Sequence, residues 1–176
     1  MAVWSEVAWS ALTADTRLDA EYYRPEYLSQ EGAIEAGPHE RLDAIADVSD
    51  GNHISIADAF CEDGIRYLRG QDLSDFFVSD SDPAYIPEST YNALKRPHMR
   101  PRDVLLGVVA TIGTVSLVTD RFGKLTGNCK IAVIRPREVD GEYLAAYFAS
   151  PVGQRELHRR ARGDRKSTRL NSSHYS

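Results

Sequence analysis

The chain has 176 residues, of which 42% are hydrophobic and 27% are charged, a length and composition typical of a single soluble domain. Its net charge is −5. Residues 1–82 carry 18 acidic and 5 basic side chains, whereas residues 83–163 carry 7 acidic and 13 basic ones. This asymmetry fits contact with a polyanion on one face, and it equally fits an acidic solvated face packed beside a basic one.

Because no run of about 18 apolar residues occurs and the first residues lack a basic region followed by an apolar core, we expect no transmembrane helix, signal peptide or membrane partner.

The first half of the chain predicts short helices, strands and loops. Tyrosines near helical spacing indicate a helix within residues 19–34, with Pro25 in its first turn because proline breaks a helix interior. Alternating apolar and charged residues at 65–69 indicate a strand. The other elements predicted here are a strand or helical turn at 4–12, a turn at 37–38, a short helix at 42–46, a loop at 52–63, a turn at 70–72, a short strand at 76–79 and a short helix at 87–94.

Residues 102–120 form the stretch around which the chain is organised. The polar pair Arg102-Asp103 precedes a valine-rich apolar run at 104–110, and a second run at 115–118 follows the interruption at 111–113. Short apolar runs between turn residues indicate strands, and continuous apolar character indicates burial on both faces. We therefore predict a core hairpin at the buried centre of a sheet. The two glycines of this stretch indicate a bulge or the close approach of another backbone.

The last part of the chain predicts one more strand and two helices. A loop is expected at 123–128 and a strand at 129–135. Asp140 suits the N-cap of one helix, and Ser150-Pro151 suits the start of another that ends near residue 161. Because strands come first and helices late, without regular alternation, we predict an α+β fold, with short helices and a mixed, partly barrel-like sheet.

The sequence shows no catalytic or metal-binding motif within residues 1–163. It lacks a P-loop, a GxGxxG segment, an HExxH helix, a paired Cys/His set for zinc, and the Asp-x-Lys or Glu-x-Lys of a carboxylate–lysine nuclease. Cys61 and Cys129 stand far apart and outside any CxxC spacing, which favours reduced thiols in a cytoplasmic protein. We therefore predict a chain that is not an enzyme and uses no cofactor.

Side chains suited to reading DNA lie in three loops and one basic connector. Lys and Arg contact phosphates and guanine, Asn and Gln suit adenine, and Ser or Thr suits either. Loops at 52–55, 69–71 and 121–130 and the connector at 95–102 carry such residues, although any one of them alone would also suit a solvated loop. The candidate DNA-binding residues are His53, Ser55, Arg69, Gln71, Lys95, Arg96, Arg100, Lys124, Asn128 and Lys130.

Loose motifs run in a consistent order through most of residues 1–163. They are RLDAEYYRPEY at 17–27, LDAIADV at 42–48, GIRYLRGQDL at 64–73, DVLL at 103–106 with TIG at 111–113, IAVIRP at 131–136, and YL at 143–144 with FASPVGQ at 148–154. Together they resemble the target-recognition domain of the specificity (S) subunit of type I restriction–modification systems. The chain departs from that pattern at Arg102, where the family has glycine, and at Gly107, which precedes the expected position.

The resemblance implies a function and a set of partners. Such a domain reads one half of a split DNA target, while separate modification (methyltransferase) and restriction subunits methylate and cut. The implied partners are double-stranded DNA and those subunits. We divide the chain into an entry segment with a helix at 1–40, a single target-recognition domain at 41–163 and a tail at 164–176. The alternatives are the recognition module of a fused methyltransferase–nuclease enzyme and a protein-interaction module that does not bind DNA.

The tail differs in character from the rest of the chain. The segment DRKSTRLNSSHYS at 164–176 has one large apolar residue and no periodicity. Residues 164–174 match, residue for residue, the in-frame translation of a common short-read sequencing adapter. We therefore expect a non-native tail and a natural chain that continues past Gly163, and we leave the tail out of the fold prediction.

Sequencing the source locus across the codon for Gly163 tests this expectation. We expect the reading frame to continue through a long helix into a second similar domain, beside modification and restriction genes. A frame that encodes residues 164–176 and then stops would contradict it, and would favour a stand-alone half-subunit or an interaction module.

Overall fold

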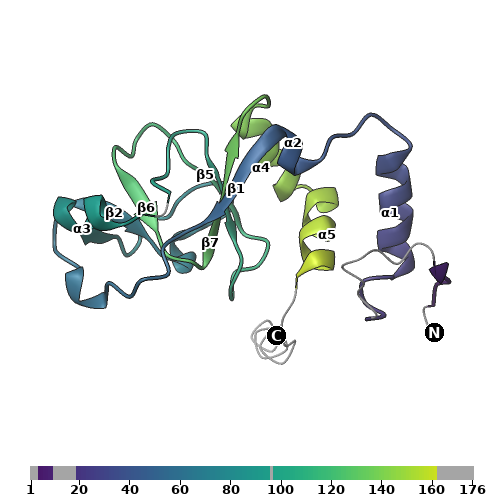
Figure 1. Cartoon of the computed structure of the whole chain (residues 1–176), viewed down its shortest axis with the longest axis horizontal. Coiled ribbons are helices and arrows are strands. Elements are labelled where there is room, and N and C mark those ends of the chain that lie inside the picture. Colours follow the sequence, from purple (N-terminus) through teal and green to yellow (C-terminus); the bar gives the residue numbers. More distant parts are fainter. Residues whose placement is uncertain (1–3, 10–18, 96, 162–176) are drawn as a thin grey trace.

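The computed structural model describes residues 4–9, 19–95 and 97–161 (Figure 1). Its α-helices are α1 (Pro25–Glu35), α2 (Leu42–Ile45), α3 (Glu88–Ala93), α4 (Gly141–Ala149) and α5 (Pro151–Arg160). Its strands are β1 (Ala46–Asp50), β2 (Ile65–Leu68), β3 (Ala84–Ile86), β4 (Val104–Gly107), β5 (Val115–Leu117), β6 (Leu125–Gly127) and β7 (Ile131–Pro136). Short 3-10 turns occupy Ala57–Ala59 and Gly70–Asp72. The tail at 164–176, Arg96 and positions 10–12 of the segment predicted at 4–12 lie outside the described residues.

The strands form two sheets, neither of which is closed. The larger sheet has the order β1-β7-β4-β5 and is antiparallel throughout. The smaller sheet has the order β3-β2-β6, in which β2 runs antiparallel to β3 and parallel to β6. The mixture of helices and sheets agrees with the α+β prediction. The partly barrel-like sheet is not confirmed, because the three- and four-residue strands of the smaller sheet form a separate open sheet instead of continuing the larger one.

Strands β4 and β5 of the larger sheet are buried on both faces, which explains the continuous apolar run of the central hairpin, whereas the edge strand β1 is partly exposed. Val104 and Leu106 of β4 pack with α4 in one hydrophobic cluster. Leu105, which points to the opposite face, packs with Leu68 of β2 and Leu125 of β6 in a second cluster. All residues of β4 and β5 are buried. The sheet therefore lies between a helical layer and the smaller sheet, and the predicted core hairpin is confirmed.

Three predicted helices are confirmed together with the residues that begin them. Pro25 occupies the first position of α1. The Asp140 carboxylate accepts a hydrogen bond from the backbone N–H of Glu142 at the start of α4, and the Ser150 hydroxyl accepts one from Gly153 at the start of α5. These side chains satisfy N–H groups that the first turn of a helix leaves without partners.

Four sequence predictions about strands and loops are corrected by the structure. The helix predicted at 42–46 is a single turn that ends at Ile45, after which β1 pairs with β7. The loop predicted at 123–128 contains the buried strand β6. The stretch at 76–79 makes only isolated bridges among the described residues. The run at 104–110 ends as a strand at Gly107, because the chain folds back there so tightly that a Cβ would lie 2.2 Å from the Thr111 carbonyl oxygen.

Helix α1 lies apart from the two sheets, beside α5 (Figure 1). None of its residues is buried, so polar contacts rather than a shared core fix its position. The Arg159 guanidinium on α5 donates to the Glu31 carboxylate at 3.0 Å, and Gln30 donates to the Val152 carbonyl at 3.0 Å. The entry segment is thus held by hydrogen bonds to the last described helix.

Asn52 joins the two sheets. Its side-chain amide is buried and donates to Thr126 Oγ1 at 2.9 Å and to the Gly127 carbonyl at 3.0 Å. Its backbone N–H also donates to that carbonyl, and its own carbonyl accepts from Cys129. The backbones at Gly51 and Asn128 lie so close together that a Cβ on Gly51 would be 2.1 Å from the Asn128 carbonyl oxygen. Residues 51–52 therefore fasten the end of β1 to the end of β6.

Replacing Asn52 with alanine should destabilise the chain. The Thr126 hydroxyl and the Gly127 carbonyl would lose a buried partner, so we expect the free energy of unfolding to fall by about 2–4 kcal/mol. Denaturant unfolding of the full chain, followed by circular dichroism, measures this change. The matched control is Asn92→Ala on α3, where the asparagine is exposed and the expected change is within about 0.5 kcal/mol. Equal effects of the two substitutions would refute the proposed role of Asn52.

Candidate nucleic-acid interface

Four loops meet at one end of the two sheets. They are the loop after β1 at 53–55, the turn after β2 at 70–72, the β4–β5 connection at 108–113 and the turn before β7 at 128–130. We call the exposed side chains of these four loops the loop surface. Three of the loops fall in segments that the sequence predicted to read DNA, although those segments are distant along the chain.

Backbone hydrogen bonds hold these loops against one another. The N–H of Val108 donates to the Lys130 carbonyl at 3.0 Å, and the N–H of Asn128 donates to the Leu68 carbonyl at 3.0 Å. Asn52 forms a parallel bridge with Asn128. A Cβ built on Gly70 would lie 3.3 Å from the Lys130 Cβ, so these two loops are in contact. The arrangement places loops on a rigid scaffold, which is where binding residues are commonly found.

Five of the predicted DNA-binding residues lie in these four loops, and four of them are exposed on the loop surface. His53, Ser55, Gln71 and Lys130 are exposed, and Asn128 is half-buried. The Asn128 side chain shapes its own turn, because Oδ1 accepts a hydrogen bond from the Lys130 N–H at 3.1 Å. The His53 ring contacts the Asp50 carboxylate through Nε2. The loop surface therefore presents one cation together with hydroxyl, amide and imidazole groups.

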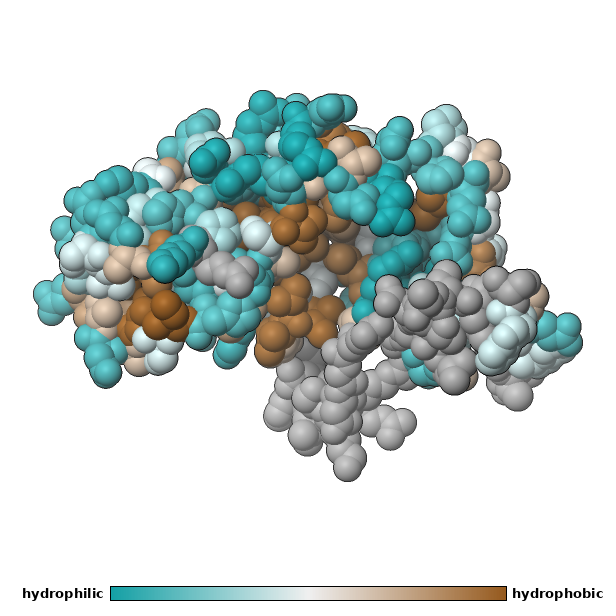
Figure 2. Space-filling model, in the orientation of Figure 1, coloured by the Kyte–Doolittle hydropathy of each residue, from teal (hydrophilic) through white to brown (hydrophobic). Residues whose placement is uncertain are grey.

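The sequence prediction missed an apolar part of the loop surface. Residues 108–110 were expected to be a buried strand, but the Val108 and Val109 side chains are 41% and 49% exposed. Ile112 in the same connection and Ile54 in the neighbouring loop are exposed as well. Figure 2 shows hydrophobic side chains reaching the lower edge of the molecule. The signal was present in the sequence, since Gly107 and Gly113 delimit the connection, and Gly113 has a φ of +92°.

Arg69 is held within the fold. Its guanidinium donates to both Asp72 carboxylate oxygens, at 3.1 and 2.9 Å, and to Asp82 at 3.1 Å. Asp72 is buried and also accepts a hydrogen bond from the Arg69 backbone N–H at 2.7 Å. The Arg69 charge is therefore balanced by two carboxylates, which leaves Gln71 and Lys130 as the more accessible groups at this end.

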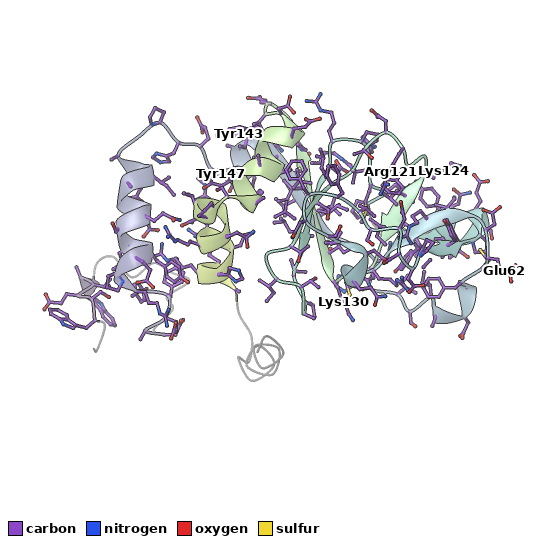
Figure 3. All side chains as sticks on the ribbon, turned by 180° about the vertical axis from the view of Figure 1, so that it is seen from behind. Glu62, Arg121, Lys124, Lys130, Tyr143 and Tyr147 are labelled. Atoms are coloured by element: carbon purple, nitrogen blue, oxygen red, sulfur yellow. The ribbon has the colours of Figure 1, made fainter. Side chains whose placement is uncertain are left out.

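Two of the other predicted residues, Arg100 and Lys124, lie near enough to Tyr91 of α3 for their charges to act on it, and Lys95 follows this helix in the chain. Lys95 and Arg100 are exposed near the end of this helix, and the Lys124 ammonium lies 5.9 Å from the centre of the Tyr91 ring and pairs with Glu88. Burial raises the pKa of Tyr91, and the charges of Lys124 and Arg100 act in the opposite direction. Figure 3 shows Lys130 well separated from Lys124, so the predicted set forms two groups and not one surface. Arg96 lies outside the described residues.

The described residues contain neither a candidate metal-binding cluster nor a helix that could cross a membrane. Within residues 4–9, 19–95 and 97–161, no group of three or more His, Cys, Asp or Glu side chains is placed to hold a metal ion. In the same part of the chain, no helix has the length and apolar character needed to span a membrane.

The comparison with known proteins gives a likeness of fold. No protein-family model and no curated protein matches the chain. Among solved structures, the HsdS subunit from Thermoanaerobacter tengcongensis is similar over 81% of this chain and 37% of that chain, with 20% sequence identity and a TM-score of 0.55. A chain from a structure on complex assembly and conformational transition of the type I R-M system is similar over 70% of this chain and 32% of that chain, with 20% sequence identity and a TM-score of 0.48. This chain thus spans about a third of the length of either one.

Proposed function

We propose that the chain recognises a short sequence in double-stranded DNA as part of the specificity subunit of a type I restriction–modification system. The observation that carries this proposal is the meeting of four loops at one end of the sheets, with a lysine and hydrogen-bonding side chains exposed on them. The fold likeness to an HsdS subunit supports it. The order of motifs along the sequence points to the same family.

The loop surface contains the chemistry that reading DNA requires. Lys130 suits a phosphate or the acceptor edge of guanine, and Gln71 suits the N6 and N7 atoms of adenine. Ser55 and His53 offer further hydrogen-bonding groups. The apolar side chains of Val109 and Ile112 suit the methyl group of thymine, which is the apolar feature of the major groove. Phosphate contacts would fix the position of the protein, and base contacts would supply specificity.

In this proposal the chain itself performs no catalysis. Modification and restriction subunits would methylate and cleave DNA, and this chain would direct them to their target as a cytoplasmic component. The recognised sequence would be one half of a split target. The two alternatives are the recognition module of a fused methyltransferase–nuclease enzyme and a protein-interaction module. Methyl transfer by the full gene product alone would favour the former.

Removing the charge of Lys130 should weaken binding to duplexes of every sequence. For Lys130→Gln we expect about a five-fold loss of affinity for a random-sequence duplex pool at low salt, with a salt slope smaller by about 1, because one phosphate contact is lost. Fluorescence anisotropy of a labelled duplex pool, measured over a range of salt concentrations, gives both quantities.

The matched control for this prediction is Arg137→Gln. Lys130 precedes β7 and Arg137 follows it, so both variants lose one exposed cation beside the same strand, about 20 Å apart along it. Arg137 pairs with Asp47, and we expect its replacement to leave duplex affinity and salt slope unchanged. Equal losses for the two variants would exclude the loop surface as the DNA contact. Failure of the unmodified chain to bind any duplex would favour the protein-interaction module.

A further inference from the structure

A pocket of about 480 Å³ opens on the smaller sheet, away from the loop surface. Its lining side chains come from β2, from β3 and the start of α3, and from the loop before β6. They include three cations, Arg66, Arg121 and Lys124, but one carboxylate, Glu88. Figure 3 shows Arg121 and Lys124 close together on this side of the molecule, far from Lys130. The excess of positive charge in a hollow of this size is a feature of sites that bind anions.

Arg66 is the group in this pocket that most needs an anion. Its side chain is 6% exposed, and its terminal nitrogens donate to the carbonyl oxygens of Ala84 at 3.2 Å and Ser79 at 3.0 Å. The nearest carboxylate, on Asp72, lies 3.6 Å from one terminal nitrogen. Among the described residues, nothing accepts a hydrogen bond from Nε. A buried Nε–H group without an acceptor carries a free-energy cost, which an anion that reached it from the pocket would remove.

The other two cations pair with exposed carboxylates, and Arg121 also donates a hydrogen bond to the carbonyl of buried Val78. Arg121 pairs with Asp80 at 2.9 Å, and its guanidinium lies over the Phe122 ring, 4.4 Å from the ring centre. Lys124 pairs with Glu88. Both carboxylates are more than half exposed, and ion pairs of this kind are weak. A phosphate that reached Arg66 would compete well with these carboxylates, because charge-assisted bonds to phosphate are strong and can be bidentate to arginine.

We infer that this pocket binds a phosphate group through Arg66, Arg121 and Lys124. Resting on the proposed function, we assign that phosphate to the backbone of the bound duplex, outside the bases that the loop surface contacts. Tyr85 and Phe122 also line the pocket, beside the three cations. The contact would strengthen binding without adding sequence information.

Titration of the full chain with inorganic phosphate tests the pocket independently of DNA. The readout is the Nε–H resonance of Arg66 in an arginine-selective ¹H–¹⁵N spectrum, with sodium chloride at matched ionic strength as the reference titration. We expect a saturable shift with phosphate and none with chloride. Arg121→Gln should weaken phosphate binding at least five-fold, whereas Arg137→Gln should leave it unchanged. A shift that is equal for both salts, or equal losses in the two variants, would overturn the assignment.

Glu88 supplies a test of opposite sign. Its carboxylate occupies Lys124 and repels an entering anion, so Glu88→Gln should tighten phosphate binding about three-fold. The side chain is exposed at the first turn of α3, and circular dichroism will verify that the variant folds. Unchanged or weaker phosphate binding by Glu88→Gln would contradict the pocket as the phosphate site.

Duplex binding then identifies the source of the phosphate. If it belongs to the DNA backbone, Arg121→Gln should lower affinity by the same factor for all duplex sequences, and saturating duplex should abolish the phosphate-induced shift of Arg66. Phosphate binding that persists beside bound duplex would overturn the backbone assignment and point to a free anion. That result would not bear on the proposed role of the loop surface in DNA binding, because the comparison of Lys130→Gln with Arg137→Gln tests that role separately.

Discussion

The buried amide of Asn52 is the interaction on which the arrangement of the loops depends. It ties β1 of the larger sheet to β6 of the smaller one, and the neighbouring Gly51 permits the backbones to come within contact distance. A buried amide is costly unless its hydrogen bonds are made, so the register between the two sheets is specified at this point. The loops that follow β1 and β6 leave the scaffold together for this reason, although 75 residues separate Asn52 from Gly127.

The residues that stabilise the fold differ from the exposed residues of the loop surface. Stability comes from the two-sided burial of β4 and β7, whose side chains alternate between a cluster with α4 and a cluster with the smaller sheet. The exposed side chains of the loop surface contribute little to either cluster. Substitutions there would disturb the core little, which is what the proposed reading of a particular DNA sequence would require. The pocket for which we propose a phosphate lies on the smaller sheet, and a phosphate contact there would add affinity.

Local sequence signals predicted the elements whose formation depends on near neighbours. Pro25, Asp140 and Ser150 mark helix starts correctly, and the valine-rich runs predict the core hairpin. Strands β1 and β6 were missed because they are short and exist only through pairing with distant segments; Thr126 is polar, yet it has no exposed surface.

For the candidate site, the sequence pointed to several loops that lie close together in the structure. It could not show that Arg69 is balanced by Asp82 and Lys124 by Glu88, since those partners lie 13 and 36 residues away. The apolar exposure of 108–112 was missed although Gly107 and Gly113 delimit the connection, because the apolar composition of the run indicates burial.

The central claim is that this chain distinguishes one DNA sequence from another, and selection from a randomised duplex library measures that property most directly. The full chain would be incubated with the library at moderate salt, and the bound duplexes would be recovered and sequenced over successive rounds. We predict enrichment of one short contiguous motif, with adenine or guanine contacts at fixed positions. Recovery of duplexes without any preferred sequence, by chain that is folded and binds DNA, would contradict the account.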